Sequence, residues 1–192
     1  IKGQGKQVFA KVLTERGRGP LKEMTLALED GVVNWQDTPE LALVGVFHRH
    51  GKNQNWTLAL LFGSGLKKGA LATTYTHDSH NLVVIGKNPE DMALAAQDLI
   101  ESGGGYTAAA DGKILGKVEL PVAGVLAQKE LHVVARGFSS FFSAAEKLGV
   151  EDNPIGLLSS LPLPVVPRYR PTDVGLVDVD KQELMKIFTF QG

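Results

Sequence analysis

The chain has no cysteine, no long apolar run and no strong charge imbalance. The lack of cysteine excludes disulfides, thiolate-ligated zinc, iron–sulfur clusters and a thiol nucleophile. No apolar run reaches the roughly 20 residues that a transmembrane helix needs. The chain has 20 Lys and Arg against 21 Asp and Glu, and the net charge of −1 gives no general field for attracting nucleic acid or an anionic membrane. We therefore expect no nucleic acid and no membrane among its partners.

The length and the apolar content are typical of one globular domain. The chain has 192 residues, and 43% of them are apolar, which is enough for a sizeable core. We expect 1–192 to form a single domain, in which 1–30 are an edge hairpin or a remnant of a preceding region. The start, IKGQGKQVFAKVL, lacks an initiator methionine and the apolar stretch of a signal peptide. We expect a fragment of a longer protein, with a cytoplasmic location.

Short continuous apolar runs predict a sheet whose strands are buried on both faces. Three such runs are LALVGVFH at 41–48, WTLALLF at 56–62 and NLVVIG at 81–86. The segment GALATTY at 69–75 is a fourth candidate, and its small residues let neighbouring strands approach closely.

Two segments have the apolar spacing of helices. In 89–102, Asn88 is suited to cap the helix and Pro89 fits its first position. The second segment is 128–148, and between the two helices YTAAADGKILGKVEL at 106–120 predicts two strands joined by a tight turn. The predicted fold is α/β (α+β), a mixed and mostly β sheet with packed helices near 89–102 and 128–148.

Polar side chains crowd into the segment THDSHN at 76–81, just before a predicted strand. A nucleophilic serine needs a strained strand-to-helix turn and an oxyanion hole, whereas Ser79 leads into a strand, so a catalytic triad is disfavoured. A ligand-binding site is one open alternative, because His, Asp, Ser and Asn supply donors and acceptors that could clamp a heteroaromatic or amide-like ligand. The simplest alternative is a turn that satisfies its own backbone.

The histidines also raise the possibility of a metal site. His48 and His50 lie at the end of a predicted strand, where alternate residues point to the same side. With His77 and His80 they would complete a four-histidine ligand set. Spacing across about thirty residues gives little geometric constraint, so we expect no metal in this domain.

A long stretch of the chain resembles the C-terminal domain of bacterial adenine deaminases, members of the amidohydrolase superfamily. The resemblance is carried by GLKKGALATTYTHDSHNLVVIGKNPEDMALAAQDLIESGGG at 65–105, LPVAGVLA at 120–127 and NPIGLLSSLPLPVVPRYRPTDVGLVDV at 153–179. Upstream, LALVGVFHRHG resembles a family strand that ends in Arg-His, and the whole match runs through 30–190 in order. His48 departs from the family pattern, in which we expect a carboxylate before Arg49.

The resemblance implies a function that depends on residues outside this chain. It implies a metal-bearing (β/α)8 barrel before this domain, in which a hydroxide activated by manganese or iron attacks C6 of adenine and yields hypoxanthine and ammonia. None of the barrel motifs is present, so the isolated chain is expected to be inactive. The implied partners are the amidohydrolase barrel domain, adenine in the full enzyme, and further copies in a homo-oligomer.

In that setting the polar cluster is expected to face the barrel mouth or a domain interface, where it would order loops or contact adenine. Two alternatives stay open, namely a standalone purine or small-molecule binding module and an interaction domain without catalysis. The candidate substrate-side or interface residues are His77, Asp78, Ser79, His80, Asn81, Arg49 and His50.

Overall fold

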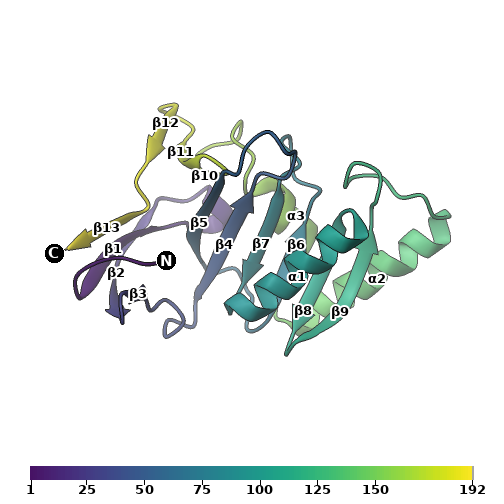
Figure 1. Ribbon diagram of the computed structural model, residues 1–192, viewed down its shortest axis with the longest axis horizontal. Helices are drawn as coiled ribbons and strands as arrows, with labels where there is room; N and C mark the ends of the chain where they lie inside the picture. Colours follow the sequence, from purple (N-terminus) through teal and green to yellow (C-terminus); the bar gives the residue numbers. More distant parts are fainter. Residues whose placement is uncertain (192) are drawn as a thin grey trace.

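The computed structural model describes residues 1–191, and a six-stranded sheet lies at its centre (Figure 1). The strands of this sheet are β4 (Leu41–Phe47), β5 (Trp56–Phe62), β6 (Ala70–Thr73), β7 (Leu82–Gly86), β8 (Gly105–Ala110) and β9 (Lys113–Glu119). Their order is β5-β4-β7-β6-β8-β9, and all neighbouring pairs are antiparallel. The strands expected from the apolar runs are therefore present.

Both faces of the central sheet are covered, which explains why its strands are apolar throughout. Alternate residues of β4 enter different cores, since Val44 packs on one face and Leu43 on the other. The core around Val44 is completed by α2 (Leu131–Lys147) and α3 (Pro154–Ser160), and the core around Leu43 by α1 (Pro89–Ser102). Figure 1 shows the helices on these two sides of the sheet. The predicted sheet-dominated fold with packed helices is confirmed.

Helix α1 has the predicted bounds because the sequence defines both of its ends. The Asn88 side chain accepts a hydrogen bond from the Asp91 N–H at 2.7 Å. Gly103 ends the helix with a left-handed φ of 79°, a conformation that favours glycine. The helix connects β7 to β8, but β6 lies between these two strands. The helix thus links two strands of one sheet that are separated by an antiparallel strand.

Helix α2 begins at Leu131, three residues later than predicted, because Glu130 still has extended backbone angles. Gly137, which interrupts its apolar pattern, faces β9. A Cβ atom there would lie 3.1 Å from the carbonyl oxygen of Lys117, so glycine allows the close approach of helix and strand. No helix within residues 1–191 combines the length and the apolar character needed to cross a membrane.

The two ends of the chain meet in a second sheet. Its strands are β1 (Gln7–Val12), β2 (Lys22–Glu29), β3 (Val32–Val33) and β13 (Phe188–Gln191), in the order β13-β1-β2-β3. The hairpin expected near the N-terminus is therefore built into a sheet with the last described strand. A third sheet contains β10 (Tyr169–Thr172), β11 (Gly175–Asp178) and β12 (Glu183–Met185).

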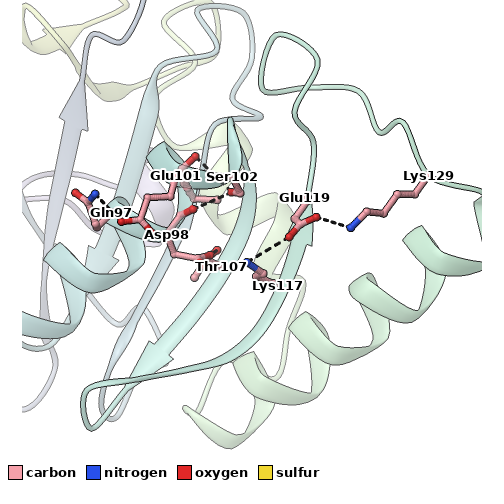
Figure 2. A network of polar contacts seen from close by, with 9 residues as sticks. Gln97, Asp98, Glu101, Ser102, Thr107, Lys117, Glu119 and Lys129 are labelled. Atoms are coloured by element: carbon pink, nitrogen blue, oxygen red, sulfur yellow. Dashed lines mark hydrogen bonds and ion pairs between the residues drawn. The ribbon is translucent and has the colours of Figure 1, made fainter.

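A row of charged side chains ties α1 to the sheet and to the loop before α2 (Figure 2). Asp98 of α1 accepts hydrogen bonds from Thr107 Oγ1 at 2.6 Å and Lys117 Nζ at 3.1 Å. Lys117 also pairs with Glu119 at 3.3 Å, and Glu119 pairs with Lys129 at 2.5 Å. Burial lowers the pKa of Lys117, but its bonds to Asp98 and Glu119 outweigh burial and leave that pKa raised. The row fastens the 120–130 loop at the same end of the sheet as the polar cluster.

Candidate functional site

The segment 76–81 connects β6 to β7 at one end of the central sheet, where β4 also ends. Thr76 is buried, and its hydroxyl donates to the Asn81 carbonyl at 3.0 Å. The His80 N–H donates to the Thr76 carbonyl at 2.8 Å, and the Asn81 N–H to Ser79 Oγ at 3.4 Å. The segment thus closes on itself as a turn and leaves the side chains of its tip, at 77–79, exposed to solvent.

Arg49 and His50 reach this turn from the end of β4. Arg49 Nε donates to the His80 carbonyl at 2.5 Å, and Arg49 Nη2 to the Ala123 carbonyl at 2.5 Å. His50 Nε2 lies 2.8 Å from the Ser79 carbonyl. The seven candidate residues therefore lie together in space, and Arg49 also ties them to the loop that precedes α2.

Two residues from the C-terminal part of the chain anchor the turn, and sequence reasoning missed both. Asn81 is 3% exposed, and its Nδ2 donates to Asp173 Oδ1 at 3.1 Å. The His77 N–H donates to the Ser159 carbonyl in α3 at 3.2 Å. Nothing in the local sequence around Asp173 or Ser159 distinguishes them, because their partners are about 80 to 90 residues away along the chain.

An aromatic stack supports the turn from below. The Tyr75 ring lies 5.6 Å from both the His77 and His80 rings and stacks on Tyr106 at 6.3 Å between centroids. Tyr106 continues into the core and lies 5.4 Å from Phe141 of α2. Burial raises the pKa of the Tyr106 hydroxyl, so this ring is neutral at physiological pH. The two histidine rings thus pack on Tyr75, which is connected through Tyr106 to the hydrophobic core.

Electrostatics keep the imidazole of His80 neutral. Burial lowers its pKa, the neighbouring Arg49, His77 and His50 lower it further, and Asp78 opposes them. Burial also lowers the pKa of Arg49, whose guanidinium remains charged. A neutral imidazole has one donor nitrogen and one acceptor nitrogen.

Three buried polar atoms at this site have no hydrogen-bond partner within residues 1–191. They are His48 Nδ1, His80 Nδ1 and Asn81 Oδ1, and the described residues contain no other such side-chain atom. Buried polar groups in folded proteins are nearly always paired, because an unpaired one costs about 1–3 kcal/mol. All three lie at the end of the sheet where the turn at 76–81 and the end of β4 meet.

Comparison with known families agrees with the resemblance seen in the sequence. A family model described as the adenine deaminase C-terminal domain matches residues 20–183. The chain belongs to this family. The most similar relatives include an adenine deaminase of Clostridium perfringens strain ATCC 13124, 38% identical over 167 residues, which are 86% of this chain and 29% of that protein.

Two further relatives give the same picture. Adenine deaminase 2 of Carboxydothermus hydrogenoformans is 41% identical over 159 residues, covering 82% of this chain and 28% of that protein. An adenine deaminase of Clostridium botulinum strain ATCC 19397 is 38% identical over 179 residues, covering 93% and 30%. This member of the adenine deaminase C-terminal domain family thus spans less than a third of the length of the relatives it matches.

The adenine deaminase C-terminal domain does not build the four-histidine metal site considered above. Within residues 1–191, no three His, Asp or Glu side chains are grouped so that they could hold a metal ion. The rings of His48 and His50 are neighbours, 5.4 Å apart and perpendicular, but they do not converge with His77 and His80 on one point. The alternative ligand set of His48, His50, His77 and His80 is therefore not assembled within the described residues.

A small cavity lies beside Arg49 on the α1 side of this domain. It has a volume of about 240 Å³, and Thr74, Leu82, Leu99 and Ile100 contribute to its walls. Pockets that enclose drug-sized ligands measure about 300–1,000 Å³, so this one lies below that range. The polar cluster is better described as a fastened surface turn than as an enclosed pocket.

Proposed function

We propose that this chain is the C-terminal domain of an adenine deaminase, an enzyme that converts adenine and water to hypoxanthine and ammonia. The family match and the names of the relatives support the reaction. The short span of the match supports a separate catalytic domain. The family resemblance implies that this domain is a metal-dependent barrel of the amidohydrolase type. We expect that enzyme to be a cytoplasmic homo-oligomer.

In this proposal the turn at 76–81 faces the catalytic domain and supports the loops that close over adenine. The observation that supports this role is the gathering of the buried, unpartnered atoms of His48, His80 and Asn81 next to the exposed tip at 77–79. The exposed residues 77–79 belong to a turn whose backbone and Asn81 side chain are held by Arg49 and Asp173. Because the conformation of the turn is set before any contact, it is suited to order a neighbouring loop.

The chemistry of the metal belongs to the catalytic domain. Manganese or iron there would lower the pKa of a bound water and supply the hydroxide. The residues of this chain do not fit such an ion, as no described group of three ligands is present, so no catalytic step is assigned to them. Their part is positioning, and the neutral His80 ring is available as donor or acceptor toward a loop or the substrate edge.

A purine-binding module without catalysis is the second candidate function. The unpartnered Asn81 Oδ1 favours it, since an amide oxygen accepts well from the exocyclic amine of adenine. Calorimetry of the isolated chain with adenine would support this candidate if it shows saturable binding at micromolar concentration. The Asn81 Oδ1 atom is buried in the structure, so we expect no such binding by the isolated chain.

The test is a chimeric enzyme in which this chain replaces the matched part of the Clostridium perfringens relative. We expect the chimera to release ammonia from adenine, whereas the relative cut before the matched part should be inactive. The isolated chain with adenine and Mn²⁺ or Fe²⁺ should release none. Turnover by the isolated chain, or a chimera no more active than the truncated relative, would contradict the proposal.

The role of the turn is tested in the same chimera by His80→Ala, with His132→Ala as the control at an exposed position on α2. We expect His80→Ala to lower kcat with unchanged metal content and melting temperature, because it removes a positioning contact and no ligand. His132→Ala should leave kcat unchanged. Equal kcat in both variants would leave the turn with a packing role only.

A further inference from the structure

A groove of about 490 Å³ runs along the outer edge of β5, next to the candidate site. The side chains of Trp56 and Leu58 form one wall, and Met185, Ile187 and Phe188 belong to the opposite side. Trp56 is 60% exposed although it is one of the largest apolar side chains in the protein. An apolar groove with an open tryptophan is typical of a surface that another polypeptide covers.

The backbone of β5 is also open along this groove. β5 is the edge strand of the six-stranded sheet, and Leu13 covers only its far half, where the Leu13 N–H donates to the Leu60 carbonyl and the Phe62 N–H donates to the Leu13 carbonyl. Because strand residues alternate in direction, the N–H and C=O groups of Leu58 and Trp56 point outward as those of Leu60 and Phe62 do. The register confirms this direction, since the inward-facing Asn55 carbonyl pairs with His48.

The outward groups of Trp56 and Leu58 therefore have no partner strand within residues 1–191. Exposed edges of this kind are normally blocked by lysine, proline or a bulge, because they pair readily with another chain. β5 itself carries no lysine or proline, and the groove beside it is lined mostly by apolar side chains together with Lys2 and Lys186. An extended segment that adds to this edge would satisfy the backbone groups and cover Trp56 at the same time.

The family description and the length of the relatives support the choice of this segment. Ile1 itself lines the groove, and Figure 1 shows the N-terminus close to β5. The family is described as a C-terminal domain, so in the relatives most of the protein precedes the matched part. The groove is therefore a surface of the C-terminal domain that the larger, preceding part of such a protein could cover.

We infer that the catalytic domain of the proposed enzyme contributes an extended segment that pairs with β5 at Trp56 and Leu58 and fills this groove. The inference rests on the proposed function and names the surface through which the two domains dock. The groove is continuous with the candidate site, since Thr57 Oγ1 donates to the Asp173 carbonyl at 3.3 Å and the Asp173 carboxylate holds Asn81. Docking here would bring the turn at 76–81 against the catalytic domain.

Residue-resolved hydrogen exchange tests this docking, with the isolated chain and the chimera as the two samples. The amides of Trp56 and Leu58 should exchange quickly in the isolated chain and at least about tenfold more slowly in the chimera. The amides of Thr57 and Ala59 point toward β4 and should be protected in both, which provides a control within the same strand.

The outcomes separate this inference from the proposed function. Fast exchange of Trp56 and Leu58 in an active chimera would overturn the docking and leave the function intact. Slow exchange in an inactive chimera would support the docking and contradict the function. If both amides already exchange slowly in the isolated chain, and more slowly at higher protein concentration, a second copy of the chain occupies the groove. That result would overturn the inference.

Matched variants give a second measurement. In the chimera, Trp56→Lys should abolish the protection of the Leu58 amide, whereas Leu131→Lys, at an 84% exposed apolar position on α2, should preserve it. In the isolated chain, Leu58→Pro should be tolerated because it removes an unpaired N–H, and Thr57→Pro should unfold the edge because it removes a bond to β4. Equal damage by the two prolines would contradict the open edge.

Discussion

Arg49 joins two segments that are far apart in the sequence, the turn at 76–81 and the loop around Ala123. Each contact uses a different nitrogen of the same guanidinium, one on the His80 carbonyl and one on the Ala123 carbonyl. Gly124 is part of this arrangement, because a Cβ atom there would lie only 2.6 Å from the Arg49 Nη2 atom. A planar group with several donors is needed to serve both carbonyls.

Arg49→Lys should therefore destabilise the domain despite keeping the charge. A single ammonium cannot reach both carbonyls, and one lost charged hydrogen bond costs about 1.5–3 kcal/mol. Urea unfolding of the isolated chain measures the change. Arg136→Lys is the control, because Arg136 is exposed on α2. Equal unfolding midpoints for the two variants would contradict the bridging role.

His80 should make the stability of the domain depend on pH. Its pKa is lowered from 6.5 in the folded state, chiefly by burial and then by Arg49, so below about pH 6.5 this site binds more protons in the unfolded chain than in the folded chain. The free energy of unfolding should fall as the pH decreases through about 6.5, until the folded pKa is reached.

Denaturant unfolding at about pH 7.5 and about pH 5.5 measures this dependence. His80→Gln should reduce the difference between the two pH values, whereas the exposed control His132→Gln should leave it as in the unmodified chain. An unchanged pH dependence in His80→Gln would show that other groups are responsible.

At the scale of the elements, helix ends and apolar strands could be predicted from the sequence because their signals are local. Asn88, Pro89 and Gly103 act on neighbouring residues, so the bounds of α1 follow from them directly. The close packing of α2 on β9 could not be predicted, because it depends on Gly116, whose missing side chain matters only once the helix lies beside it.

Gly116→Ala should disrupt this packing. An added Cβ would lie 2.4 Å from the Ser140 carbonyl oxygen and 3.0 Å from the Phe141 nitrogen, and both are backbone atoms that cannot rotate away. Overpacking of this kind costs about 1–3 kcal/mol. Thermal unfolding should show a lower midpoint than for Leu115→Ala, a neighbouring change at a 42% exposed position. Equal midpoints would mean that α2 shifts without cost.

At the scale of the whole molecule, the contacts that assemble the candidate site join residues that no local pattern connects. Asn81 meets Asp173, and Arg170 is 1% exposed although it lies in a basic, proline-rich stretch. Arg170 donates to the carbonyls of Val166 and Arg16, so it holds the N-terminal turn against the C-terminal part. The residue types at the site could be chosen from the sequence, but their anchors depend on the complete fold.

The position of the N-terminal strands also depends on contacts with distant parts of the chain. Residues 1–30 were expected to be either an edge hairpin or a remnant of a preceding region. β1 lies between β2 and β13, so it is a central strand of a sheet shared by both ends of the chain. The side chain of Val8 in β1 is fully buried in the same core as α1, whereas the adjacent Phe9 is 41% exposed on the other face of the strand.

Val8→Asp should unfold the whole domain, because it places an unpaired carboxylate in a core shared with the central sheet, at a cost above about 3 kcal/mol. Phe9→Asp is the matched control, with the same new side chain one residue along, and should fold normally. Circular dichroism melting and binding of a hydrophobic dye measure both. If these residues were a separable remnant, Val8→Asp would leave the melting of the helices unchanged, since the α1 core would not depend on β1.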